Sequence, residues 1–398
     1  MAPPTSAAPP LLDPTSPEFV EDPHPLFDLL RPSGPVVRDR IGWSTLDYAI
    51  SEAAFHDAAL VPGIDHLLVD RGIEPLWAVF DHSLTDAEGD VHRRLRRAVS
   101  PWFSVRRIGQ LRERTRALVD ELLRDAPRGS DDSFDVMAGL ADVVPARLFC
   151  WMVGASEADA PELIRMSKTL LAVFTATDDM VEPVRTVKAE VADFAAELLT
   201  TRRLRPADDL ATALLAAESS GAIEEGDAAH LLEELLSASV DNTANTTALA
   251  LLTLAENPAA WAAVHADPML LDAAVEECGR YQPAIRHTIK AAVAPTTLGG
   301  VDVAAGEYVT IRIAAAHRDP AVFDDPHTFD IHRRASAGQL AFGAGRHYCL
   351  GAALGRMEVA EMVGGLVGRW PVAEVRDGVD MDLNVSGIVR ALPLGAAS

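Results

Sequence analysis

The chain of 398 residues has only three cysteines, Cys150, Cys278 and Cys349. So few cysteines cannot form the disulfide framework of a small secreted domain, and they suit a reducing compartment. Basic residues are also scarce, because 35 Lys and Arg face 59 Asp and Glu, for a formal net charge of −24. Since phosphate binding needs clustered positive charge, this balance argues against a nucleic-acid partner.

Long apolar runs and targeting signals are missing as well. No stretch reaches the about 18 uninterrupted apolar residues of a membrane-spanning helix. The first ten residues, MAPPTSAAPP, have neither the basic start nor the apolar core of a secretory signal. We therefore expect a soluble, cytoplasmic protein that does not contact a membrane. The early prolines predict an extended, disordered lead-in over residues 1–25, followed by a single domain over residues 26–398.

What remains is a chain that favours helices. Apolar residues make up 48% of it, and segments rich in alanine, leucine and glutamate are separated by Pro and Gly clusters, which predicts a mainly α fold. Residues 297–313 predict a β-hairpin, and residues 381–389 form a weaker strand-like patch. The longest predicted helix covers residues 227–256, with Asp227 as its N-cap and Pro258 beyond its end. At 1.5 Å per residue it would span about 45 Å.

Residues 342–351, with the sequence FGAGRHYCLG, are the most informative segment. Gly343 and Gly345 allow a tight turn that passes close to a flat ligand. Cys349 stands before an apolar, helix-forming run, where unpaired N–H groups and the helix dipole favour a thiolate. A buried thiolate needs a counter-charge or a metal, and thiolate-ligated haem iron favours O–O cleavage. The alternative is a cysteine that only packs in the core.

This segment resembles the haem-binding loop of the cytochrome P-450 family, whose bacterial members are typically soluble. The resemblance runs from about residue 20 to the end and implies a mainly α fold with a small β-rich lobe. Haem b, iron protoporphyrin IX, would lie between the long helix and the loop, with Cys349 as axial thiolate. Phe342 would pack beside the sulfur, the backbone at Gly343 would pass close to the haem, and His347 would reach a propionate. The implied activity is monooxygenation: activation of O2 and insertion of one oxygen atom into a small, largely apolar organic substrate.

Glu277 and Arg280 lie three residues apart on one predicted helix, hence on one face. Alone, such a pair is common on protein surfaces. Here it resembles the family's Glu-x-x-Arg pair, and Arg333, in the run FDIHR, fits the arginine that completes a buried triad. The resemblance implies that this triad is structural and braces the cysteine loop.

His92 and Arg96 lie four residues apart on one predicted helical face. The resemblance implies that they hold the haem propionates, whereas the alternative is a solvated basic face. The family usually has an arginine about ten residues after Arg280 as a further propionate ligand. This chain offers Lys290 or Arg286, and the choice stays open; lysine would neutralise a carboxylate without bidentate geometry.

The middle of the long helix departs from the family pattern of a small residue, glycine, two residues ending in an acid, and threonine. Here Ser239 replaces the glycine and Asn242 replaces the threonine. In the family, acid and alcohol together deliver protons, but an amide cannot relay a proton as a hydroxyl can. Thr243 is the adjacent catalytic candidate, yet it points about 100° around the helix and would be a poor substitute unless the helix is distorted. Asp241 remains the expected route for solvent protons, with a salt-bridged groove acid as the alternative.

Positive charge gathers in one part of this acidic chain. Between residues 93 and 116, nine arginines face one acid, Glu113. This local excess predicts an acidic partner, and the resemblance implies a ferredoxin-type electron donor with its reductase, since the sequence shows no dinucleotide fingerprint. The expected docking residues are Arg93, Arg94, Arg97, Arg106 and Arg107.

Loss of the threonine motivates a rival interpretation, a haem-thiolate enzyme that is driven by peroxide or that couples or rearranges its substrate. A non-catalytic haem sensor is a third hypothesis. The substrate itself is not determined by the sequence. Arg286 or His82 could hold a substrate carboxylate. The expected pocket walls are largely apolar, although each side chain could equally be core: Trp77, Phe80, Leu170, Phe174, Leu235, Ala238, Ser239, Ala284, Ile285, Ile388 and Val389.

Overall fold

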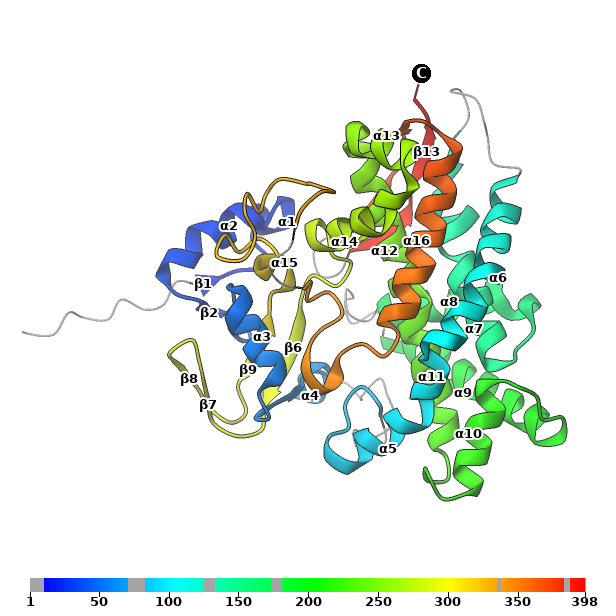
Figure 1. Cartoon of the computed structure of the whole chain (residues 1–398). Coiled ribbons are helices and arrows are strands. Elements are labelled where there is room, and N and C mark those ends of the chain that lie inside the picture. Colours follow the sequence, from blue (N-terminus) through cyan, green and yellow to red (C-terminus); the bar gives the residue numbers. More distant parts are fainter. Residues whose placement is uncertain are drawn as a thin grey trace, which may run out of the picture.

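Helix-rich segments form one lobe of the molecule, and a smaller lobe is built around a β-sheet beside it (Figure 1). The computed structural model describes residues 11–70, 83–124, 133–172, 181–334, 338–382 and 387–397. The predicted fold class, mainly α with a small β-rich lobe, is confirmed.

The helices of the smaller lobe are α1 (Pro17–Glu21), α2 (His24–Leu30), α3 (Tyr48–His56), α4 (Ile64–Asp70) and α15 (Ile313–Ala316). Those of the larger lobe are α5 (Gly89–Val99), α6 (Val105–Arg124), α7 (Val143–Val153), α8 (Ala160–Ala172), α9 (Val181–Leu204), α10 (Leu210–Ser219), α11 (Asp227–Ser239), α12 (Asp241–Glu256), α13 (Pro258–Ala266), α14 (Leu271–Tyr281) and α16 (Ala352–Arg369).

The main sheet has six strands in the order β1-β2-β3-β9-β6-β4. Its strands are β1 (Leu11–Leu12), β2 (Val36–Asp39), β3 (Gly42–Thr45), β4 (Leu60–Pro62), β6 (Thr288–Ala292) and β9 (Tyr308–Ile311). β3 pairs with β9 in parallel, and β6 pairs with β9 and β4 antiparallel. The smaller sheets contain β5 (Phe134–Asp135), β7 (Thr296–Leu298), β8 (Val301–Val303), β10 (Ala373–Val375), β11 (Asp380–Asp382), β12 (Ile388–Ala391) and β13 (Pro393–Ala396).

Three predicted elements differ in detail. Of the predicted lead-in over residues 1–25, residues 1–10 lie outside the described part of the chain, whereas residues 11–25 contain β1, α1 and the start of α2, because Leu12 and Phe19 bury their side chains. The predicted hairpin over 297–313 is divided, since β7 pairs with β8 while β9 joins the main sheet. The patch at 381–389 is confirmed as the pair β11 and β12.

The predicted long helix is two helices, α11 and α12, which meet at Val240. Its ends agree with the prediction, except that Asp227 is the first helical residue and Gly226, at φ +95°, caps it. α12 packs against α14 and α16, and α16 also packs against α6, so the helix that follows Cys349 is held from several sides. None of the described helices combines the length and apolar composition needed to cross a bilayer.

Candidate functional site

The cysteine loop is a tight turn between the β-rich lobe and α16. Gly343 and Gly345 have φ of +67° and +69°, which favours glycine. A side chain at Gly345 would also begin 2.6 Å from the carbonyl oxygen of Phe55. The backbone N–H of Cys349 donates to the carbonyl oxygen of Phe342 at 2.9 Å and closes the loop. The loop therefore depends on its two glycines, as the sequence predicts.

Cys349 differs from the other two cysteines, because its side chain is exposed whereas Cys150 and Cys278 are buried. The N–H groups of Gly351 and Ala352 lower the pKa of Cys349, but desolvation by the surrounding protein is larger and raises it overall. The expectation that the helix start alone would favour a thiolate is thus not met. A thiolate at this position needs a further source of positive charge, which fits a metal ligand.

His92 and Arg96, both on α5, lie beside this loop. The His92 ring lies 4.4 Å from the ring of His347, centroid to centroid. Arg96 donates from its guanidinium to the carbonyl oxygen of Tyr348 at 2.7 Å. His347 Nε2 lies 3.1 Å from Glu88 Oε1, and burial is the main reason why its pKa falls to about 4. The structure therefore brings together three predicted haem-binding residues from opposite halves of the chain.

Lys290 on β6 belongs to the same group. It is 5% exposed, its Nζ lies 5.8 Å from the centre of the Phe55 ring, and burial, together with nearby Arg346, lowers its pKa to about 8. Arg286 instead feels the charge of Asp22, at the end of α1. Lys290 therefore lies close enough to the predicted haem-binding residues for its charge to act on His347.

The residues around Cys349 fit a haem with two propionates. The thiol side chain is exposed, and the Nε2 atom of His92 is buried with no hydrogen-bond partner among the described residues. A desolvated ammonium, that of Lys290, lies nearby. A buried donor or acceptor without a partner costs free energy, so anionic groups at this position would satisfy both His92 and Lys290.

The predicted triad is assembled. Glu277 accepts two hydrogen bonds from Arg280, both at 2.7 Å, and one from Arg333 Nε at 3.1 Å. Arg280 also donates to the carbonyl oxygens of His317, Pro326 and Thr328. These bonds tie α14 to the chain that leads into the cysteine loop, as a structural role requires.

At the junction of α11 and α12, side chains bond to backbone carbonyls within the helices. Ser239 Oγ donates to the carbonyl oxygen of Leu235, and Asn242 Nδ2 donates to that of Ala238 at 3.2 Å. The amide oxygen of Asn242 is therefore the atom that remains to accept a hydrogen bond. Asn242 offers an acceptor where the family usually has a hydroxyl.

Asp241 is buried, and desolvation raises its pKa to about 6. Asn245 Nδ2 donates to Asp241 Oδ2 at 2.7 Å, and Asn245 Oδ1 accepts from the backbone N–H of Val389 at 2.7 Å. The charge of Lys168 acts in the opposite direction and lowers the pKa of Asp241. Asp241 is thus held by an amide and titrates closer to neutrality than an exposed aspartate.

Glu358, on α16, was missed in the sequence. Its carboxyl is buried and accepts a hydrogen bond from Thr243, and desolvation raises its pKa to about 8. The available signal was an acid within the otherwise apolar face of the helix that follows the cysteine, but the partner lies 115 residues earlier and has no local signature.

The predicted pocket walls divide into three groups. Leu170, Leu235, Ala284 and Val389 are buried in the main hydrophobic core. Ala238 is exposed, and Ser239, Ile285 and Ile388 are half-buried. Predicted residues that lie outside the described part of the chain are Trp77, Phe80, Phe174 and His82.

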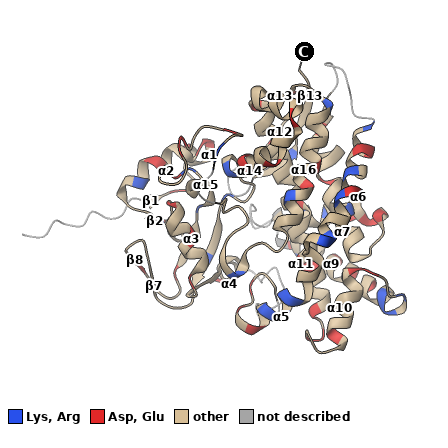
Figure 2. Ribbon diagram, viewed as in Figure 1, with Lys and Arg blue, Asp and Glu red and all other residues tan. Residues whose placement is uncertain are grey.

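The arginine-rich face carries less free charge than the sequence predicts. Figure 2 shows acidic residues interspersed with the basic ones along α5 and α6. Six of the nine arginines form ion pairs, namely Arg93, Arg94, Arg107, Arg112, Arg114 and Arg116. Of the five predicted docking residues, Arg97 and Arg106 are exposed and have no ion pair among the described residues. The expected local excess is therefore reduced by ion pairs, most of which are with acids distant in the sequence.

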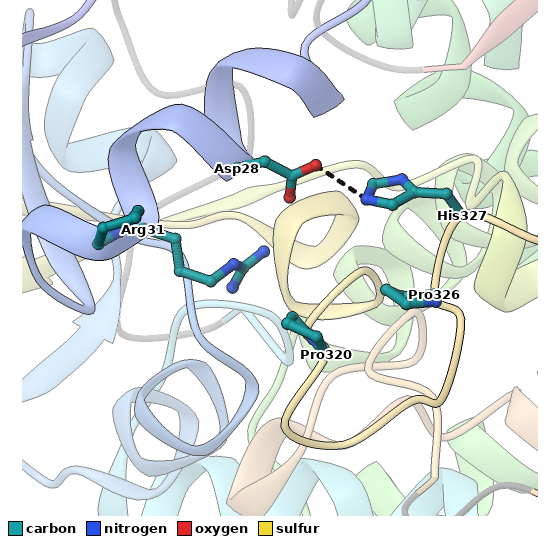
Figure 3. Close-up of a pocket in the computed structure, with 6 residues that line it drawn as sticks. Asp28, Arg31, Pro320, Pro326 and His327 are labelled. Carbon is teal, nitrogen blue, oxygen red and sulfur yellow. Dashed lines mark ion pairs between the residues drawn. The ribbon is translucent and has the colours of Figure 1, made fainter.

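A cleft of about 500 Å³ opens elsewhere, between α2 and the chain after α15 (Figure 3). Asp28 and His327 face each other across it at 2.8 Å, with Arg31 beside them. The cleft shares no residue with the Cys349 site.

Comparisons with known proteins agree with the geometry. The family model described as Cytochrome P450 matches residues 34–391. The chain is 32% identical over 377 residues to Cytochrome P450 monooxygenase PikC of Streptomyces venezuelae, which covers 92% of this chain and 89% of that protein. The crystal structure of CalO2 has a TM-score of 0.88 at 26% identity, covering 97% of this chain and 99% of that chain. CxnD, described as a cytochrome P450 enzyme for C–S bond formation in chuangxinmycin biosynthesis, has a TM-score of 0.85 at 26% identity, with 98% of each chain covered.

Proposed function

Because this chain belongs to the cytochrome P450 family, we propose that Cys349 is the axial thiolate of its haem b and that His92, Arg96 and Lys290 hold the propionates. Members of this family are haem-thiolate oxidoreductases, and the relatives include named monooxygenases. When bound, haem activates O2 so that one oxygen atom is inserted into an organic substrate. The observation that supports the assignment most strongly is the buried, unpartnered nitrogen of His92, whose ring lies against His347 in the loop that carries the exposed Cys349.

Asp241 is the proposed route for solvent protons. Its raised pKa allows it to exchange protons near neutral pH, which suits a proton-transfer group. Asn242 positions a water or a polar substrate group through its amide oxygen, because its amide nitrogen already donates a hydrogen bond to the carbonyl oxygen of Ala238. Ala238 and Ser239, at the end of α11, line the substrate side, and the exposed alanine supports a largely apolar substrate.

Electrons come from a ferredoxin-type donor and its reductase, and the donor docks where Arg97 and Arg106 lie. These two arginines remain exposed, and an acidic partner would be attracted to them. Cys150 and Cys278 are unpaired and buried, which supports a reducing, cytoplasmic location.

The rival within the same family is a peroxide-driven or bond-forming enzyme. It is favoured by Asn242 at the usual threonine position and by the similarity to CxnD. The test compares turnover with ferredoxin, reductase and NAD(P)H against turnover with hydrogen peroxide alone. Substrates for both arms are first selected by the high-spin shift that they induce in the haem spectrum. Faster turnover with the ferredoxin system supports monooxygenation, and faster turnover with peroxide supports the rival.

A further inference from the structure

A buried carboxylate on α11 holds the turn that precedes α5. Glu234 is 7% exposed and lies one helical turn before Ala238. Its Oε2 accepts from the backbone N–H of Leu84 at 2.8 Å, and its Oε1 accepts from the Ser83 hydroxyl and from the N–H of Thr85 at 3.5 Å. One side chain therefore binds three consecutive residues that are about 150 positions earlier in the sequence.

The Ser83 hydroxyl makes most of the side-chain hydrogen bonds within this turn. Its Oγ accepts from the backbone N–H groups of Thr85 and Asp86, each at 3.1 Å, and lies 3.0 Å from Asp86 Oδ2. The hydroxyl has one proton, yet it faces the carboxyls of both Asp86 and Glu234. Burial raises the pKa of both carboxyls, that of Glu234 to about 7, which agrees with a proton shared within the cluster.

The turn leads directly into the haem side of the molecule. Glu88, two residues after Asp86, directly precedes α5, and its carboxyl binds both Arg346 and His347 of the cysteine loop. His92 follows one turn into the helix. A second contact supports the same arrangement, because Arg94 of α5 forms an ion pair with Glu224 at 2.6 Å, just before α11.

We propose that Glu234 is a positioning residue for the haem: through Ser83 and the backbone of residues 84 and 85, it sets where α5 begins and hence where His92 stands relative to Cys349. Glu234 contacts neither haem nor the reacting atoms in this arrangement. The inference rests on the proposed role of His92 as a propionate ligand.

The chain supplies a matched control, since the adjacent Glu233 is 9% exposed and burial raises its pKa as well. Glu233 makes none of the hydrogen bonds to residues 83–86 described above. Glu233→Gln therefore repeats the chemical change at a buried acid without affecting the turn.

The experiment measures haem release from the holoenzyme to excess apomyoglobin. Glu234→Gln should release haem about tenfold faster than wild type, the effect of losing one hydrogen bond to a charged group, and Glu233→Gln should stay within about twofold. Ser83→Ala should also speed haem release, and the double variant should release haem more slowly than the two single effects combined, because both changes remove the same Ser83–Glu234 hydrogen bond. Ser83→Thr, which keeps the hydroxyl, should restore the wild-type rate.

Equal rates for Glu234→Gln and Glu233→Gln, or additive effects of Ser83→Ala and Glu234→Gln, would overturn the proposal. If Glu234→Gln yields no holoenzyme, the comparison of Ser83→Ala with Ser83→Thr decides alone: equal haem release by these two variants also overturns it. The ferrous–CO spectrum of the wild type tests the haem-thiolate assignment separately, so failure of the two ideas is distinguishable.

Discussion

Thr243 on α12 donates a hydrogen bond to the buried carboxyl of Glu358 on α16. This contact directs the hydroxyl next to Asn242 toward the helix that follows the cysteine. We therefore propose that Thr243 does not simply replace the missing family threonine. Glu358 and Asp241 are two buried acids near the junction of α11 and α12, and the pKa of each is raised.

Glu358→Gln should change how stability depends on pH. Burial raises the pKa of Glu358 from 4.5 to about 8. Between these values the unfolded chain has lost a proton that the folded chain retains, so this residue makes stability fall as pH rises from about 4.5 to about 8. Glu358→Gln has no titrating group at this position, so its free energy of unfolding does not fall in this way. Its stability relative to wild type should therefore be greater at pH 8 than at pH 5. Urea unfolding at the two pH values measures this; a difference independent of pH would contradict it.

Asp241→Asn should lower turnover about a hundredfold, within the range for loss of a proton-transfer group. Asn242→Ala should lower it less. If Asn242 positions water, its loss should raise hydrogen peroxide release at unchanged substrate affinity. If it binds substrate, affinity should weaken by about 0.5–1.5 kcal/mol. Product and peroxide yields per NAD(P)H separate these cases, and a nearly silent Asp241→Asn would remove Asp241 from the proton route.

Cys349→Ala should abolish the red-shifted Soret band of the ferrous–CO complex, because the thiolate ligand is lost. Cys150→Ala and Cys278→Ala should retain this band, since both side chains are buried away from the loop. A thiolate-type spectrum from Cys349→Ala would show that another residue is the ligand.

Glu277→Ala should destabilise the fold by about 3–5 kcal/mol, because it leaves the charges of Arg280 and Arg333 uncompensated. Glu276→Ala is the control: its partner Arg356 is on α16 and both side chains are partly exposed, so the loss should be about 1 kcal/mol or less. Denaturant unfolding of the two variants tests the difference, and equal losses would argue against a buried structural triad.

Arg97→Glu combined with Arg106→Glu should slow transfer of the first electron about tenfold at low ionic strength, because steering by charge is lost. Substrate affinity should not change. Stopped-flow reduction at several salt concentrations measures the effect, and added salt should bring wild type and variant closer together. Arg165→Glu is the control, since Arg165 on α8 already pairs with Glu162 and Glu190. If the rate of first-electron transfer depends neither on salt nor on the two substitutions, the proposed docking surface is wrong.

The sequence by itself determined the features that depend on neighbouring residues. The loop over residues 342–351 was predicted because its glycines, cysteine and helix start are consecutive. The pairs Glu277–Arg280 and His92–Arg96 were predicted because helical spacing puts residues three or four apart on one face. Mainly helical structure followed from composition and from the Pro and Gly breaks.

Only the tertiary structure decided the contacts between distant segments. The burial of Lys290 on β6 and the action of its charge on His347 are not encoded in their spacing along the chain. Arg94 and Arg107 form ion pairs with Glu224 and Asp208, acids that are more than 100 residues later in the chain. Glu234 and Glu358 bind residues that are distant in the sequence, and burial in the folded chain raises the pKa of each carboxyl. Charge pairing and desolvation are properties of packed surfaces, and a linear pattern does not contain them.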